Sequence, residues 1–258
     1  MKFTLQTTFS SSQYRQAKRI SQQCKHLTAV LVQKDISLIA RRAKIQTIGS
    51  FLSMEGNDLS EKEVTKILAH QALRLPDNEI QEVKNIAKVY DCLSKWDPLS
   101  VRDLKNAHRM LMIDLDAESG QWRKSEVQIL EGKKIVHTPP LPKEISMMMK
   151  QVFSYIRGNK QISWLLKACI LHYGIQYIHP FIDGNGRIGR IWQHLLMLKE
   201  SSVFRYVLIG NIIKQHASEY YRSLDKSDKQ KDPSIFVDFC LHYLSLELNK
   251  FSKKLAKL

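Results

Sequence analysis

The chain has 258 residues, of which 43% are hydrophobic and 25% charged, and its formal net charge is +15. The apolar content is enough to bury a core, and no run of about 18 apolar residues predicts a membrane span. These properties argue against a membrane protein and predict a soluble globular chain.

The basic charge is compatible with nucleic acid, an acidic surface, an acidic protein or a phosphorylated small molecule as partner. Because lysines and arginines are scattered along the whole sequence, a solvated surface is favoured, and neither membrane nor nucleic acid is an expected partner. The N-terminus lacks the apolar stretch of a signal peptide, and the four cysteines have no zinc-site or disulfide spacing. We therefore expect a cytoplasmic protein, with secretion as an effector without a signal peptide left open.

Apolar residues recur mainly three and four positions apart, and only 10 glycines and 7 prolines occur, which predicts a mainly helical chain. The first expected helix follows the serines at 10–12, which can cap it. Its predicted inner face consists of Tyr14, Ala17, Ile20, Cys24 and Leu27. The second expected helix ends near residues 55–57 and carries Ile45, Ile48, Phe51 and Leu52.

Three further helices are expected over residues 60–73, 80–96 and 100–115, with caps at Ser60 and Ser100. The pattern changes within residues 120–142, where apolar residues alternate on both sides of a Glu131-Gly132-Lys133 turn. These alternating residues are Val127, Ile129, Ile135 and Val136. The segment therefore predicts a short β-hairpin.

Helical spacing resumes over residues 144–156 and 163–178, and the second segment is apolar nearly all round. It should therefore run through the core and end at His179. Helices are also expected over 187–198, around Glu219-Tyr220-Tyr221, and from Pro233 onward. The last helix carries a row of Leu241, Leu244, Leu248, Phe251, Leu255 and Leu258. Packing against the chain's own body is the favoured interpretation of this row, and a homo-oligomer seam is the alternative.

Residues 179–190 read His-Pro-Phe-Ile-Asp-Gly-Asn-Gly-Arg-Ile-Gly-Arg, a concentration of functional groups that folding alone does not require. Pro180 disfavours α geometry at His179, so the imidazole should project from a fixed edge, as a general base needs. Gly184 and Gly186 allow the backbone N–H groups to surround an anion at a helix N-terminus. The segment therefore predicts a base beside a phosphate site.

Two arginines and a carboxylate extend this site. Arg187 and Arg190 are three residues apart, so on a helix they share a face and can contact successive phosphates. Asp183 is an oxygen ligand beside them, suited to hold Mg²⁺ together with phosphate oxygens and waters. A glycine-rich turn alone would be weak evidence, since it also caps helices, and the lysine of a P-loop is missing.

Residues 179–190 resemble the signature of the Fic family, HPFx[DE]GNGRxxR, at every specified position. The resemblance extends to AESGQWRKSEVQI before the motif and to EYYRSLDKSDKQKDPSIFVDF after it. It implies an all-α Fic fold with a short β-hairpin flap. No low-complexity linker separates two halves of the chain, so we expect one helical domain with an N-terminal helical extension: the extension over residues 1–60 and the Fic domain over residues 61–258.

The family's activity implies transfer of AMP from ATP to a Ser, Thr or Tyr hydroxyl of a target protein. His179 would deprotonate that hydroxyl, and Asp183 would bind Mg²⁺. The α-phosphate would be held by Asn185 with the amides of Gly184 and Gly186, and the outer phosphates by Arg187 and Arg190.

The resemblance also assigns roles outside the motif. The hairpin over residues 125–138 would be a flap whose strand edge pairs with an extended segment of the protein substrate. Val127 would border the nucleotide, together with Ile129. Tyr220 would lie near the adenine, although a tyrosine on an amphipathic helix is also typical of a core.

Many Fic proteins carry an inhibitory helix reading [ST]xxxE[GN], whose glutamate pairs with the second arginine of the motif. Glu55 with Gly56 is the candidate here, and it would pair with Arg190. Phe51 stands where the hydroxyl residue is expected, so the match is partial. The alternative is that residues 55–57 only end a helix.

Three other functions remain open at this point. The same site could remove AMP from a modified target, or transfer another phosphate-containing group. A different class is a non-catalytic regulator that senses a nucleotide or binds DNA, which would show salt-dependent DNA binding.

Overall fold

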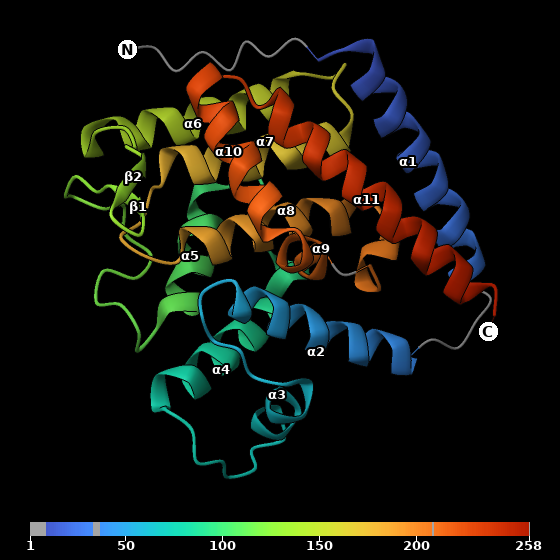
Figure 1. Cartoon of the computed structure of the whole chain (residues 1–258), viewed down its shortest axis with the longest axis horizontal. Coiled ribbons are helices and arrows are strands. Elements are labelled where there is room, and N and C mark those ends of the chain that lie inside the picture. The colour runs from blue at the N-terminus through green and yellow to red at the C-terminus, as the bar shows by residue number, and fades with distance from the viewer. Residues whose placement is uncertain (1–8, 33–36, 208, 258) are drawn as a thin grey trace.

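A computed structural model describes residues 9–32, 37–207 and 209–257. Within these ranges the chain forms eleven α-helices, two 3₁₀ segments and one two-stranded antiparallel sheet, so the predicted helical fold class is confirmed (Figure 1). The helices before the sheet are α1 Ser11–Leu31, α2 Ser37–Ser53, α3 Glu61–Leu68, α4 Asp77–Cys92 and α5 Val101–Met112. Those after it are α6 Pro142–Gly158, α7 Trp164–Ile178, α8 Asn185–Glu200, α9 Ile209–Gln215, α10 Ala217–Gln230 and α11 Ser234–Leu255.

The predicted serine caps are confirmed, and one inward-facing residue was predicted wrongly. The hydroxyls of Ser10, Ser60 and Ser100 each accept a hydrogen bond from a backbone N–H group in the first turn of α1, α3 and α5. Tyr14 is 40% exposed, whereas Gln13 is buried and its amide donates hydrogen bonds to the beginning of α11. Gln13, whose amide binds the polar start of α11, therefore takes the inward position that the spacing predicted for the Tyr14 ring.

Two central helices, α7 and α8, pack against each other and position the loop between them (Figure 1). Helix α7 is buried on nearly every side, as its sequence predicts. Helix α11 packs against α1, α7 and α10, and the apolar row from Leu241 to Leu255 is buried within the chain. The row is therefore core and not a free dimer seam, while Leu258 lies outside the described residues.

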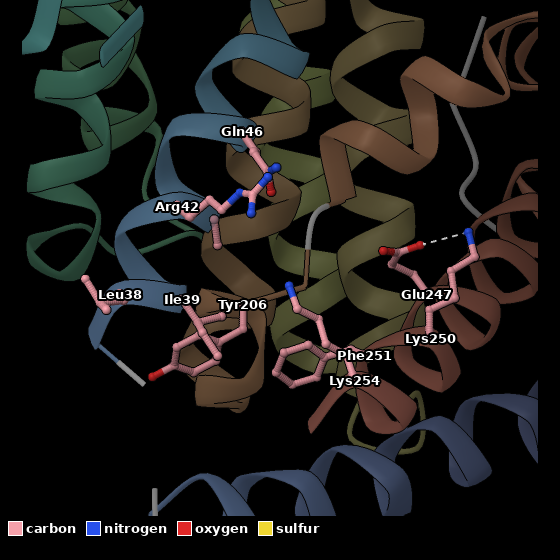
Figure 2. A pocket seen from close by; sticks show the side chains of 10 residues that line it. Leu38, Ile39, Arg42, Gln46, Tyr206, Glu247, Lys250, Phe251 and Lys254 are labelled. Atoms are coloured by element: carbon pink, nitrogen blue, oxygen red, sulfur yellow. Dashed lines mark ion pairs between the residues drawn. The ribbon is translucent and has the colours of Figure 1, made fainter. Parts of the chain in front are cut away.

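Helix α2 packs against α3, α4 and α9, and most of its buried residues lie in its second half. Ile48, Phe51 and Leu52 are fully buried there. Helix α9, which packs against this half of α2, was not predicted from the sequence. Gly210 allows the close packing of α9, because a Cβ at this position would lie 2.8 Å from the Phe51 ring. The first half of α2 instead borders a hollow of about 320 Å³ beside α11 (Figure 2). The firmly packed end of α2 is therefore the end that leads to Glu55.

The predicted hairpin is confirmed, with strands β1 Ile129–Glu131 and β2 Lys134–His137 joined by a two-residue turn. Gly132 adopts a positive φ of 59° in that turn. The pairing skips one residue of β2 opposite the start of β1, and Val127 precedes the strand. Among the described residues, no helix has the length and apolar character needed to cross a membrane.

Candidate active site

His179 ends α7 in a left-handed backbone conformation, with φ 48° and ψ 60°. The following Pro180 disfavours right-handed α geometry at this position, as the sequence predicts. The His179 N–H group donates to the Ile175 carbonyl at 2.9 Å, so the residue is held at the helix end. The imidazole is thereby attached to a fixed point of the buried helix.

Arg123 links the backbone of His179 to the chain segments on either side of the hairpin. Its side chain is 2% exposed, and its Nε donates to the His179 carbonyl at 2.8 Å. Its two terminal nitrogens donate to the carbonyls of Ser125 and Pro140, which lie on either side of the hairpin. No chemical pattern in the sequence assigned this role, because Arg123 acts through distant backbone carbonyls.

The His179 imidazole is neutral at physiological pH. Burial, and then the nearby charges of His137 and Arg123, lower its pKa to about 4. A neutral imidazole has a free lone pair and can therefore accept a proton.

His137 anchors the hairpin beside this base. Its Nδ1 lies 2.9 Å from Asp228 Oδ2, and its Nε2 lies 2.8 Å from the Tyr177 carbonyl oxygen. Both partners are acceptors, so the imidazolium form, which donates at both nitrogens, is favoured. Burial lowers the pKa of His137, but these two partners outweigh it and raise the pKa. The end of β2 is thus tied to α10 and α7.

The side chain of Asn185 closes the loop. Its Oδ1 accepts from the Phe181 N–H group at 3.0 Å, and its Nδ2 donates to the Phe181 carbonyl at 2.9 Å. The Phe181 ring stacks on the imidazole of His108, with centroids 3.5 Å apart. The amide predicted to hold the α-phosphate is therefore engaged in bracing the loop in this conformation.

His108, from α5, supports the same loop in a defined tautomer. Its Nδ1 accepts from the Gly120 N–H group at 2.9 Å, so its Nε2 carries the proton and donates to the Asp183 carbonyl, also at 2.9 Å. Burial lowers the pKa of His108 to about 4, which keeps it neutral. The backbone of the motif is therefore positioned by α5.

Helix α8 begins at Asn185, two residues earlier than predicted, with Gly184 as its N-cap at φ 75°. A Cβ on Gly184 would lie 2.7 Å from Met112 Sδ, so glycine is required both for the conformation and for the close packing. Since Gly184 has no side chain to cap the helix, the first N–H groups of α8 are available to an anion.

Arg190 lies at this helix start and contacts Glu55. Its Nη2 donates to Glu55 Oε1 at 2.6 Å and to the Phe51 carbonyl at 3.2 Å, and its guanidinium lies 5.7 Å from the centre of the Phe51 ring. A Cβ on Gly186 would lie 2.7 Å from the same Glu55 oxygen. Burial lowers the pKa of Arg190, but Glu55 outweighs it and raises the pKa. The Glu55 carboxylate thus lies over the glycine turn where phosphate was predicted.

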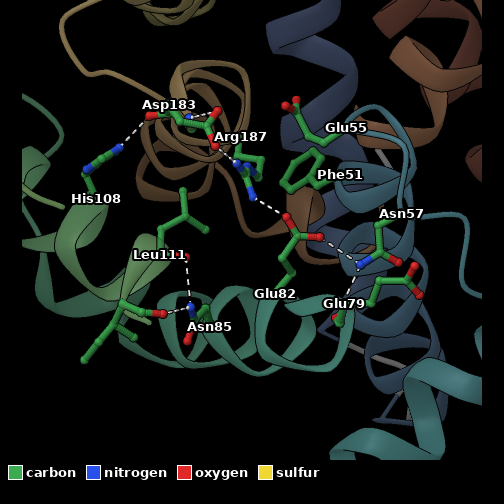
Figure 3. A network of polar contacts seen from close by, with 12 residues as sticks. Phe51, Glu55, Asn57, Glu79, Glu82, Asn85, His108, Leu111, Asp183 and Arg187 are labelled. Carbon is green, nitrogen blue, oxygen red and sulfur yellow. Dashed lines mark hydrogen bonds and ion pairs between the residues drawn. The ribbon is translucent and has the colours of Figure 1, made fainter. Parts of the chain in front are cut away.

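Arg187 contacts a different pair of carboxylates (Figure 3). Its Nη1 donates to Glu82 Oε1 at 2.6 Å, and its Nη2 donates to Asp183 Oδ2 at 2.9 Å. The side chains of Arg187 and Arg190 are 4% and 1% exposed. Glu82 was missed at the sequence level, because a glutamate on an amphipathic helix carries no signal of its distant partner.

Asp183 has the properties expected of the predicted Mg²⁺ ligand. Its side chain is 61% exposed, and its two oxygens accept from the Gly184 N–H group and from Arg187, which leaves lone pairs for a cation. The described residues contain no group of three or more acidic, His or Cys side chains placed to hold a metal ion. The exposed carboxylate of Asp183 is the kind of single ligand that can hold Mg²⁺ together with phosphate oxygens and water.

The residues assigned to the nucleoside are placed differently. Tyr220 is 1% exposed and its hydroxyl lies 3.0 Å from His172 Nε2, which favours the core interpretation of this tyrosine. The adjacent Tyr221 is 51% exposed. Val127 is partly buried next to the hairpin.

Comparisons with known proteins show similarity in both sequence and fold. A profile of the Fic/DOC family matches residues 98–197. The crystal structure of a Fic family protein from Desulfovibrio desulfuricans G20 is 30% identical, covers 96% of this chain with 76% of its own, and superposes with a TM-score of 0.89. Fic-1 from C. elegans, at 20% identity and a TM-score of 0.77 over 96% of this chain and 74% of its own, shares the fold.

Among curated relatives, a "Protein adenylyltransferase Fic" from Aedes aegypti is 28% identical over 236 residues. The match includes 86% of this chain but only 44% of that protein. A protein of the same name from Culex quinquefasciatus is 29% identical over 77% of this chain and 40% of its own length. The chain thus spans less than half the length of these relatives.

Proposed function

The chain belongs to the Fic/DOC family, and from this premise we propose that it is a protein adenylyltransferase that moves AMP from ATP to a protein hydroxyl and is inhibited by Glu55. The names of the relatives support the activity. The observation that carries the inhibited form is the 2.6 Å contact between Glu55 and Arg190 over the glycine turn.

His179 is the proposed general base. Its pKa of about 4 leaves the imidazole neutral, ready to take the proton of the target hydroxyl. The hydroxyl oxygen forms a bond to the α-phosphorus as the bond to pyrophosphate breaks. His179 keeps the proton until solvent removes it.

The start of α8 is the proposed phosphate site. Backbone N–H groups at Gly186 and its neighbours stabilise the α-phosphate, and Arg190 neutralises charge on the departing pyrophosphate. Mg²⁺, when bound at Asp183, would neutralise further phosphate charge. Arg187 holds the Asp183 carboxylate at 2.9 Å, so its proposed part is to orient that ligand as well as to attract phosphate.

Glu55 is the proposed inhibitory residue. Its carboxylate accepts from Arg190 and carries the charge that a phosphate would otherwise bring to this place. Phe51 replaces the hydroxyl residue of the inhibitory pattern, yet its carbonyl and ring both contact Arg190. These contacts support inhibition despite the departure from the pattern.

The hairpin is the proposed docking flap for the protein substrate. Leu130 and Ile135 are 57% and 48% exposed, and β1 and β2 pair only with each other within the described chain, so an outer edge can accept an extended segment. We also propose that residues 1–60 form an N-terminal helical extension with the inhibitory helix, that residues 61–258 form the Fic domain, and that the protein is cytoplasmic.

Labelled ATP with Mg²⁺ tests this function. Glu55→Gly should label itself and lysate proteins more strongly than the unchanged chain, and adding His179→Ala should abolish the label. ATP should compete with the label, whereas UTP, GTP and CDP-choline should not. Labelling that survives His179→Ala would remove the proposed base, and competition by another donor would change the transferred group.

A further inference from the structure

The turn that carries Glu55 is held from a second side by Asn57. Asn57 is 4% exposed, and its Nδ2 donates to Glu82 Oε2 at 2.8 Å and to the Glu79 carbonyl at 3.3 Å (Figure 3). Both acceptors belong to α4. The turn after α2 is therefore tied to a helix that the inhibitory pattern does not include.

Glu82 uses its other oxygen on the catalytic loop. While Oε2 accepts from Asn57, Oε1 accepts from Arg187 at 2.6 Å. The Glu82 side chain is 17% exposed and that of Arg187 is 4% exposed, so this charged contact is little screened by solvent. One carboxylate thus joins the turn after α2 to the first turns of α8.

Gly56 explains why such a tie matters. It lies between Glu55 and Asn57 and has a φ of 88°, and a Cβ there would have nothing within 4 Å. A glycine in open space gives the backbone freedom to rotate. Without a restraint on its far side, the turn could move Glu55 away from Arg190.

We propose that Asn57 and Glu82 are positioning residues that hold the Glu55 turn against α8 and so restrain Arg187 and Arg190 together. This inference rests on the proposed inhibitory role of Glu55. Entry of a phosphate at Arg190 requires Glu55 to leave, and the Asn57–Glu82 contact opposes that movement. Loss of the contact therefore favours nucleotide binding without altering His179 or the glycine turn.

The test is titration of the purified chain with a non-hydrolysable ATP analogue and Mg²⁺. Asn57→Ala should bind the analogue about tenfold more tightly than the unchanged chain, the size expected for one charge-assisted hydrogen bond. In a Glu55→Gly background the same substitution should change the affinity little. Asn57→Asp, which sets a carboxylate against Glu82, should tighten binding further.

Glu79→Gln is the matched control. It changes a partly exposed carboxylate of α4 three residues before Glu82, and it leaves the Glu79 carbonyl that Asn57 contacts in place. It should bind the analogue as the unchanged chain does.

The outcomes separate this inference from the proposed function. If Glu55→Gly binds more tightly but both Asn57 variants do not, the positioning role is wrong and the inhibitory role stands. An equal effect of Asn57→Ala in both backgrounds would show that Asn57 acts independently of Glu55, which also overturns the inference. If Glu55→Gly binds the ATP analogue no more tightly than the unchanged chain, both the inhibitory role of Glu55 and the positioning role of Asn57 and Glu82 are wrong.

Discussion

Glu55→Gln is the substitution that isolates the charge of the inhibitory carboxylate. The contact with Arg190 is a charge-assisted hydrogen bond of 2.6 Å to a guanidinium that is 1% exposed, while Glu55 itself is 24% exposed. Hydrogen bonds that involve a charged group contribute about 1.5–3 kcal/mol, and the bond between two charged groups should lie toward the upper end of that range. The bond that glutamine keeps has only the guanidinium charge and should lie toward the lower end. The difference of about 1.5 kcal/mol corresponds to roughly tenfold tighter ATP binding.

Calorimetric titration with a non-hydrolysable ATP analogue and Mg²⁺ measures this change. Asp58→Asn is a suitable control, because Asp58 is 75% exposed and its pairing with Lys214 at 3.7 Å lies on the surface. The control should leave the affinity unchanged. Equal affinities for Glu55→Gln and the unchanged chain would refute the claim that this carboxylate competes with phosphate for Arg190.

Three other predictions concern stability. Phe51→Ala empties a fully buried site and should cost about 3–5 kcal/mol, visible as a lower Tm; an unchanged Tm would contradict the packing of α2. Gly184→Ala forces a Cβ to 2.7 Å from Met112 Sδ at a φ of 75°, so it should also lower Tm and reduce labelling, whereas a neutral result would contradict the loop geometry. The raised pKa of His137 means that its contact with Asp228 stabilises the fold fully below about pH 6.5 and is lost as pH rises through the folded-state pKa. The Tm difference between the unchanged chain and His137→Gln should therefore shrink between pH 6 and pH 9 (about the range that spans this titration), and a constant difference would contradict this.

The local parts of the fold followed from the sequence because their causes are local. Ser60 and Ser100 cap the helices that follow them, and glycine at position 132 permits the hairpin turn. Helix α9 was not predicted, since it has seven residues and is defined by its close packing on α2. The prediction that Tyr14 faces inward was wrong because the burial of Gln13 depends on a partner on α11, more than 200 residues away in sequence.

In the candidate site, too, the residues of the local motif were predicted from the sequence, whereas most of their distant partners were not. The motif indicated a base, a carboxylate and two arginines within twelve residues, and the structure brings them together on one loop and helix. Apart from Asp183 in the loop itself, the partners of the arginines come from α4, from α2 and from the turn after α2, and among these only Glu55 had a recognisable pattern. Glu82 and Arg123 act on residues 105 and 56 positions away, so their roles depend on the tertiary fold.

The most direct test of the central claim is intact-mass measurement of Glu55→Gly after incubation with unlabelled ATP and Mg²⁺, beside Glu55→Gly combined with His179→Ala. The account predicts that the first variant gains the mass of one or more AMP groups and that the second gains none. An unmodified first variant, an adduct of another mass, or an AMP adduct on both variants would contradict it.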